Sequence, residues 1–467
     1  MGEYSRRMNI KITVDVWEWV NGTKTGTYDM TTTILSYRFQ KTIKNPTGSC
    51  QFSVVPQIEN INIMDELSTM DVIKIYEFGV LKFIGYIIRI SYGGSIGNDG
   101  KPSRNTTITC QQMGGLLQTA SIGLGLCAAS GIETDSLLNA AALLSLNLAN
   151  AAEDGLSFAE MIGVLVNGFI DYIESIGAEN LSNYLSEYID ASTGLCSDEI
   201  TRLPKTFALF NGTEQSVTFW QVAEQLVERP FNELWIDNGP RIVSVGGKTV
   251  ELINKVSIVF RPTPFNGRLI DGNEGTEFDS LPVVNVDKNH LISFNLSKSM
   301  DEAYSFYSVK KAAFRMDDVR RLLLGQAKID SERIGKYLLK PLMTELFFTR
   351  IENVNGDDID PDATASKLET EGLEEATTLY NWYHLNDKYL SGVITEMVPK
   401  KAENDPKIGQ KLSVYGIEGY FYVEGIAHTW SYQGPLKTDL TVTRGYDYNH
   451  NKPIKLKDKI FSRNAIR

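Results

Sequence analysis

The sequence predicts an α+β fold that is mainly β, with two similar antiparallel β-barrel domains and with helical and α/β insertions. Two short stretches recur in the same order in both halves of the chain, which indicates an internal duplication. Within them, apolar and polar residues alternate with the period of β-strands. The chain of 467 residues is also too long for one ordinary core, so several domains are expected.

The first repeated stretch is Leu35–Ile43, which matches Ile292–Met300 at an offset of 257 residues. Each copy is followed by a second run of strand-forming residues, Cys50–Val54 in the first half and Ser305–Val309 in the second. We therefore expect each pair of runs to form two early strands of one repeat.

The second repeated stretch is Gly85–Gly94, which matches Gly425–Gly434 at an offset of 340 residues. Each copy is again followed by a strand, Thr106–Gln111 in the first half and Thr438–Thr443 in the second. Apolar residues at every second position place one face of each strand in a core. The order of the elements is thus the same in both halves.

This alignment makes specific predictions about single residues. Gly85 should superpose on Gly425, and Ile90 should superpose on Trp430. His428 is aligned with the apolar Ile88 and is therefore expected to be structural. Both His428 and Trp430 should be buried in the second β-domain.

The change of offset from 257 to 340 places 83 additional residues inside the second copy. In the middle of the chain, Val217–Leu226 predicts an amphipathic helix, and Glu233–Asn238 and Ser257–Phe265 predict strands. The expected domains are a first β-domain (1–114), an acidic helical insertion (115–205), a small α/β domain (206–288), a second β-domain (289–314 and 401–446), a helical insertion within it (315–400) and a basic C-terminal tail (447–467).

The acidic insertion accounts for the whole net charge of the chain, which is −12. Between Arg104 and Arg202 the sequence has twelve acidic residues and no lysine or arginine. A block of one sign repels nucleic acid and other acidic surfaces. A solvated helical face and a functional acidic surface both remain open as interpretations.

A duplication of this kind suits a symmetry adaptor. Closed rings need the same kind of contact at each junction. Three chains with two similar β-domains each present six similar domains, which can meet a true hexamer on one face. Features that occur once per chain are arranged with threefold symmetry in the trimer, and they can contact a trimeric partner on the other face.

Several runs resemble the baseplate hub proteins of contractile phage tails and phage-tail-like bacteriocins, and are also similar to the hub part of type VI secretion spikes. These runs are Arg229–Asp237, Phe260–Phe265, Tyr422–Trp430 and Leu440–Gly445, and the resemblance extends over about Ile34 to Gly445. It implies two tube-type β-domains per chain and a homotrimer at the base of the tail tube.

The resemblance also implies a set of partners and a location. The partners are the central spike protein, the tail tube or tube-initiator protein, the tape-measure protein and the baseplate wedge proteins. The location is the baseplate of a phage or of a headless bacteriocin (a tailocin), assembled in the cytoplasm of the host bacterium. Because only about twenty residues follow Gly445, the spike is expected to be a separate polypeptide.

We assign no catalytic, cofactor-binding or metal-binding residue. The sequence has four histidines and no HExxH, Walker A, GxSxG or paired-cysteine motif. Asn353–Asp362 resembles a calcium loop, but with Gly356 in the sixth position Ile351 would occupy the first, where an oxygen ligand is required. A solvated acidic loop is the favoured interpretation, and no cofactor is expected.

The remaining features predict a protein made in a reducing cytoplasm without a membrane anchor. The scattered cysteines (Cys50, Cys110, Cys127 and Cys196) fit neither a metal site nor a disulfide framework. Leu137–Ala152 is too short to span a bilayer. The basic segment Tyr446–Arg467 is interpreted as an arm that docks on a neighbouring subunit, with a solvated tail or a nucleic-acid contact as alternatives. Sequence-specific binding of nucleic acid is not expected.

Two other functions compete with the hub. A tail-associated cell-wall hydrolase would need a catalytic constellation, and a carbohydrate adhesin would need exposed aromatic platforms. The duplication favours the hub, which would be a structural protein rather than an enzyme.

Overall fold

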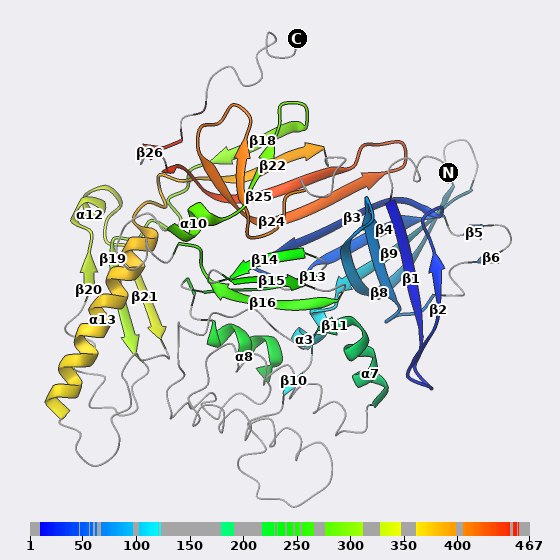
Figure 1. Cartoon of the computed structure of the whole chain (residues 1–467), viewed down its shortest axis with the longest axis horizontal. Helices are drawn as coiled ribbons and strands as arrows, with labels where there is room; N and C mark the ends of the chain where they lie inside the picture. Colours follow the sequence, from blue (N-terminus) through cyan, green and yellow to red (C-terminus); the bar gives the residue numbers. More distant parts are fainter. Residues whose placement is uncertain are drawn as a thin grey trace, which may run out of the picture.

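The computed structural model confirms an α+β fold that is mainly β (Figure 1). The structure describes residues 10–45, 47–55, 57–58, 61–62, 67–96, 102–119, 121–122, 179–190, 217–227, 229–230, 232–238, 241–245, 248–252, 255–265, 276–311, 327–346, 361–397, 405–448, 452–454 and 456. Most of the acidic insertion, the run Asn353–Asp360, Cys127, Cys196 and the last residues of the basic tail lie outside this set.

The first repeat contributes seven consecutive strands to one large sheet, in the spatial order β3-β4-β9-β8-β7-β1-β2. All of these pairs are antiparallel. The strands are β1 (Ile10–Glu18), β2 (Thr23–Asp29), β3 (Ile34–Thr42), β4 (Ser49–Val54), β7 (Val72–Glu77), β8 (Val80–Ile96) and β9 (Pro102–Gln112); a short hairpin, β5 (Gln57–Ile58) and β6 (Ile61–Asn62), stands apart.

The second repeat extends the same sheet in the order β18-β22-β25-β24, and β24 pairs with β3 of the first repeat. No pairing among the described strands closes either half into a separate barrel, because this contact joins the two halves into one sheet. The strands are β17 (Val283–Val286), β18 (Leu291–Ser297), β22 (Leu390–Met397), β23 (Lys411–Val414), β24 (Tyr420–Ser431), β25 (Lys437–Asp447) and β26 (Lys452–Pro453).

Two β-bulges occur at equivalent places in both halves and establish the duplication in three dimensions. One interrupts β3 at Leu35 and β18 at Ile292, which lie 257 positions apart as the sequence alignment predicts. The other interrupts β8 at Ile88 and β24 at Glu424, which lie 336 positions apart. Because bulges depart from the regular ladder at defined positions, they fix how the two repeats correspond.

The predicted alignment of β8 with β24 is therefore wrong by four residues. The cross-strand partners agree with the bulge: Ile90 faces Ile108 in β9, as Ile426 faces Leu440 in β25. Ile90 corresponds to Ile426 rather than to Trp430, and Trp430 corresponds to Gly94. Alternation has a period of two, so a shift by four keeps every apolar residue on the same face and leaves the register open.

The prediction that Ser305–Val309 forms the second strand of the second repeat is also wrong. Ser305–Val309 lies mainly in β19 (Phe306–Lys311), which pairs with β20 (Ala327–Ile329) and β21 (Pro341–Leu346) in a separate sheet. The place next to β18 is taken by β22, from inside the segment 315–400 that was expected to be an insertion. Both runs suit a strand equally, and only the tertiary contacts select one.

That separate sheet forms an outer lobe with α12 (Ser331–Tyr337) and the long helix α13 (Pro361–Tyr383), seen at the left of Figure 1. Its small core packs Tyr307 and Val309 of the sheet against Ala376 and Leu379 of the helix. The inserted lobe thus begins with β19 and includes strands as well as helices.

The middle of the chain contains the two predicted strands, and a third strand joins them from the segment predicted as the acidic insertion. Strand β13 (Asn232–Asn238) pairs antiparallel with β16 (Val256–Pro262), which pairs parallel with β11 (Ile189–Asp190). Helix α8 (Phe219–Leu226) begins at Thr218, whose hydroxyl accepts a hydrogen bond from the Gln221 backbone in a capping box. The remaining elements are α3 (Gly115–Thr119), β10 (Ser121–Ile122), α7 (Glu179–Tyr188), β12 (Val217–Thr218), β14 (Arg241–Val245), β15 (Lys248–Leu252) and α10 (Thr276–Ser280).

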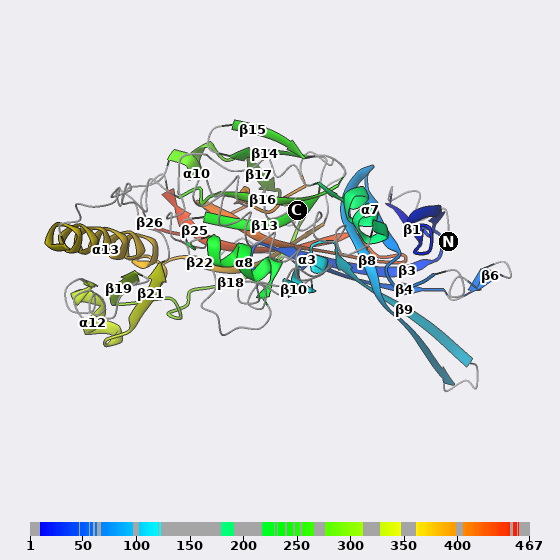
Figure 2. The same cartoon turned by 90° about the horizontal axis from the view of Figure 1, so that it is seen from below.

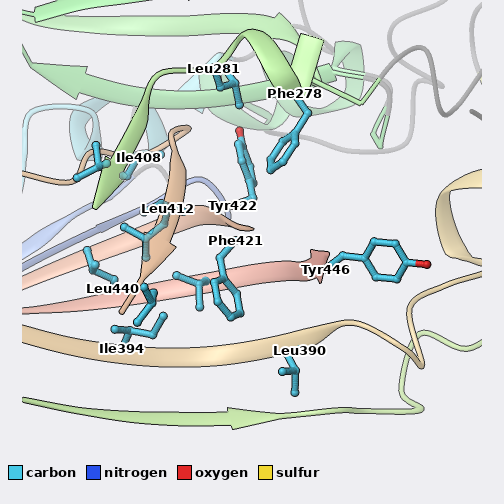
Figure 3. Packing of buried hydrophobic residues seen from close by; sticks show 14 of the residues in the cluster. Phe278, Leu281, Leu390, Ile394, Ile408, Leu412, Phe421, Tyr422, Leu440 and Tyr446 are labelled. Carbon is cyan, nitrogen blue, oxygen red and sulfur yellow. The ribbon is translucent and has the colours of Figure 1, made fainter. Parts of the chain in front are cut away.

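Each repeat has its own apolar core. Figure 3 shows the core of the second repeat, where Leu412, Phe421 and Leu440 lie among residues of neighbouring strands. The core of the first repeat contains Phe39, Phe52 and Ile75, and it also contains Trp430 and Leu436 from the second repeat. No helix in the described part of the chain is both long and apolar enough to cross a membrane.

Candidate functional site: the seam between the repeats and the open strand edges

The contact between the two repeats is a strand pair, which we call the seam. Strand β24 pairs antiparallel with β3 from Gly425 opposite Thr42 to Ser431 opposite Ser36. The Tyr432 amide continues the ladder by donating to the Leu35 carbonyl at 2.7 Å. The seam is thus a continuous run of main-chain hydrogen bonds between segments almost 400 positions apart in the sequence.

A buried polar network supports the seam on its core side. The carboxylate of Glu77, on β7, accepts a hydrogen bond from the Tyr37 hydroxyl at 2.7 Å and lies 2.7 Å from Nδ1 of His428. Glu77 and His428 are fully buried, and the imidazole stacks on Phe39 with ring centroids 4.7 Å apart. Burial, and then the charge of Glu77, raise the pKa of Tyr37 well above its usual range, so the phenol stays a donor.

His428 is structural in this setting, as the sequence predicts. It is enclosed between the two repeats rather than exposed in a cleft, and its one described carboxylate partner comes from the other repeat. Replacing either member of a buried pair leaves the other without a partner, which is costly. The network therefore couples the two halves of one chain.

Trp430 is buried as predicted, but in the core of the first repeat rather than of the second. Its exposed fraction is 2%, and its ring lies 5.8 Å from that of Tyr37. It shares the first core with Leu436 of its own repeat. The end of β24, which belongs to the second repeat, thus packs in the core of the first repeat.

Two ionic contacts add to the seam. Lys82 of β8 forms a buried ion pair with Asp405, which precedes β23 of the other repeat. Lys41 of β3 donates to Asn238 at 2.9 Å and lies 3.6 Å from Asp237, both in the middle unit. Such buried charged pairs hold elements in one defined arrangement.

The run Phe260–Phe265, which carried part of the family resemblance, joins the middle unit to the second repeat. Buried Arg261 donates to Glu233 at 3.0 Å, to the Tyr422 hydroxyl at 2.7 Å and to the Gly409 carbonyl at 3.0 Å. Gly409 has a φ of +79°, and a Cβ there would lie 2.6 Å from the guanidinium. Arg261 in this run thus holds the middle unit against the second repeat.

Outside the seam, β18 and the end of β8 each have an edge with no partner in the described part of the chain, and so do β2, β17 and β26. Strand β18 ends the sheet and pairs with β22 on one side. Strand β8 pairs with β7 only as far as Tyr86, so its later part, the β8 tail (Ile88–Ile96), has only β9 beside it. Figure 2 shows the ends of β8 and β9 projecting beyond the rest of the sheet. Exposed strand edges are templates for pairing with another chain.

The described residues of the basic tail lie on their own chain. Strand β26 pairs with β25, Lys452 lies 3.5 Å from Asp447, and Leu456 forms a bridge with Ile417. The first part of the tail therefore packs on the second repeat of its own subunit, and the predicted docking of the rest of the tail on a neighbour lies outside the described residues.

No group of metal-ligating side chains occurs within the residues that the structure describes. The predicted acidic loop Asn353–Asp362 falls almost wholly outside those residues. Sequence reasoning missed the buried acids of the seam, Glu77 and Asp405. Glu77 closes an ordinary alternating strand, and nothing local marks it as the partner of a histidine far along the chain.

This duplicated sheet, with an α/β unit and a lobe inserted, is similar in fold to a tail protein of known structure. The tail protein from Neisseria meningitidis MC58 is 12% identical with a TM-score of 0.50, over 93% of this chain and 96% of that chain. The 43 kDa tail protein of prophage MuSo2 from Shewanella oneidensis is 10% identical with a TM-score of 0.46, over 94% and 97%. In the half-lidded Francisella PdpA–VgrG complex, the matched chain is 12% identical with a TM-score of 0.42, over 96% and 59%.

No family model and no curated protein matches the sequence. The likeness to the Neisseria tail protein is therefore a likeness of fold at low identity. The predicted resemblance is confirmed as a likeness of fold to a tail protein.

Proposed function

We propose that this chain is a structural hub of a contractile-tail baseplate, a homotrimer whose six repeats form a pseudo-sixfold ring. In this role it joins a central spike protein on one face to a hexameric tail tube or tube-initiator protein on the other. A tape-measure protein would pass through the ring, and baseplate wedge proteins would contact its outside. The parent particle would be a phage or a tailocin, with assembly in the bacterial cytoplasm.

The observation that carries this proposal is the seam together with the two open edges. One chain already contains one junction between two equivalent repeats, made by the β24 end against β3. The strands equivalent to these two, β8 and β18, each have an edge with no partner among the described strands. A chain built in this way can repeat its own junction with further copies, and a closed ring would cover both of these edges.

The proposed role needs no catalysis. The role depends on the shape and symmetry of the assembly and on its strand edges. The ionisable residues described at the seam form contacts between the repeats. The inserted lobe around α13 and the acidic insertion occur once per repeat pair, so they would meet threefold partners such as the spike or the wedges.

The test is the mass of the assembly. The chain is expressed alone and together with the neighbouring spike gene, and each product is measured by light scattering and native mass spectrometry. We expect a three-to-three complex with the spike, and no release of peptidoglycan fragments from cell walls. A stable one-to-one or two-to-one complex would contradict the trimer, and cell-wall cleavage that follows the purified chain would favour the hydrolase.

A further inference from the structure

We propose that the β8 tail of one subunit pairs antiparallel with β18 of the next subunit, with Ser91 opposite Ser297. This inference rests on the proposed ring and specifies which strands close it and in what register. The partner is a second copy of this chain, and the contact continues the seam already present inside each subunit.

The register follows from the two bulges. Residues of β24 correspond to residues 336 positions earlier in β8, and residues of β3 correspond to residues 257 positions later in β18. In the seam, Ala427 lies opposite Gln40. On the open edges, Ser91 of β8 corresponds to Ala427 and Ser297 of β18 corresponds to Gln40. The equivalent pair is therefore Ser91 opposite Ser297.

The same register brings exposed apolar residues together. It places Ile88 opposite Met300, Tyr92 opposite Leu296 and Ile96 opposite Ile292, and of these residues Leu296 alone is half-buried. In the subunit, Tyr92 is 68% exposed, Ile96 78% and Met300 57%, and Ile88 and Ile292 are exposed as well. Exposed apolar residues in such number on two strands mark an interaction surface. This match adds to the correspondence of the bulges, which itself uses Ile88 and Ile292.

The register obtained from the sequence alignment alone fits less well. It would place Ser91 opposite Ser293, four residues from the structural register, and Ile96 opposite Lys288, which lies three residues before β18, as Met300 lies three residues after it. An apolar side chain that is 78% exposed would then face a lysine rather than Ile292. The two registers differ by four residues, so the same side chains point to the same face of the sheet in both. They differ only in which residues lie opposite each other.

Tyr92 would take the place that His428 has in the seam. His428 contacts Glu77. Lys411 corresponds to Val72, and counting five residues on from Lys411 gives Gly416, two residues past the end of β23, as the position that corresponds to Glu77. Gly416 has no side chain and lines a hollow of about 490 Å³ with residues of β17 and β23. The junction between subunits would therefore lack a counterpart of the Glu77–His428 contact found within a subunit.

Gly94 supports a close approach of a neighbour. It lies in an exposed strand, and a Cβ added there would meet nothing within 4 Å. Glycine weakens a strand interior and often marks the approach of another backbone. The subunit itself gives no reason for glycine at this position, whereas its equivalent, Trp430, is packed tightly in the seam.

The test is disulfide capture in the full-length chain. In the seam, the Tyr432–Leu35 hydrogen bond shows that Ala427 and Gln40 form a non-hydrogen-bonded pair. Side chains of such pairs approach closely enough for a disulfide. The variant Ser91→Cys/Ser297→Cys tests the structural register, and Ser91→Cys/Ser293→Cys tests the sequence-derived register with the same chemistry. Single-cysteine variants and the unaltered chain control for Cys50, Cys110, Cys127 and Cys196.

Both variants are oxidised mildly, alone and co-expressed with the spike gene, and run on non-reducing gels. We expect covalent dimers and trimers at least tenfold more abundant for the 91/297 pair than for the 91/293 pair. A trimer by mass with stronger crosslinking at 91/293, or with no crosslink at either pair, would overturn the register while leaving the hub intact. If no trimer formed under any condition, both the proposed homotrimeric hub and this inference would be contradicted.

Discussion

Replacing Trp430 with alanine tests whether the two repeats are coupled through the seam. The indole is 2% exposed and packs in the core of the first repeat, with its ring 5.8 Å from that of Tyr37. Truncating a buried large aromatic side chain to alanine costs about 3–5 kcal/mol. Because Trp430 comes from the second repeat, this loss should appear in the first repeat, which contains no substitution.

The matched control is Trp430→Phe. Among the described residues the indole nitrogen has no hydrogen-bond partner, so phenylalanine keeps most of the ring and loses no described hydrogen bond. We expect this variant to cost about 1–2 kcal/mol. The comparison separates the loss of packing from the loss of the polar group.

The assay combines urea unfolding with hydrogen exchange, because a chain of several units does not unfold in one step. In Trp430→Ala we expect faster exchange of the amides of β3 as well as those of β24. A cost below about 1 kcal/mol would contradict the packing argument. Faster exchange confined to β24 and β25, with β3 unchanged, would contradict the coupling between repeats.

Three further predictions concern buried groups. Arg261→Met should cost about 3–5 kcal/mol by leaving the carboxylate of Glu233 buried without its partner, and the double variant with Glu233→Gln should recover part of that loss in urea unfolding. Gly409→Ala should also lower the urea midpoint, because φ is +79° and the new Cβ would lie 2.6 Å from the Arg261 guanidinium; an unchanged midpoint would refute this. Burial, and then the charge of Asp405, raise the pKa of Glu396 to about 8, so the folded chain holds this proton more tightly than the unfolded chain, where the pKa is near 4.5. Stability should therefore fall as pH rises from about 4.5 to 8, and Glu396→Gln should flatten that slope in thermal unfolding; an unaltered slope would show that another group is responsible.

The sequence by itself determined the duplication and the correspondence of continuous segments. Leu35–Ile43 and Ile292–Met300 correspond at the offset read from the sequence, and they even share a bulge at the same position. Thr106–Gln111 and Thr438–Thr443 also correspond, as their cross-strand partners show. Such matches can be read from one chain because side-chain identity and alternation are local properties.

Only the tertiary structure decided which strands are neighbours and in what register. Ser305–Val309 and Leu390–Met397 both suit a strand, yet only the second pairs with β18. The four-residue error between β8 and β24 kept every apolar residue on its face, so the local pattern could not reveal it. The contact between Glu77 and His428 spans 351 positions. Pairing, register and seam are set by packing between segments distant in the chain, and no local pattern encodes that packing.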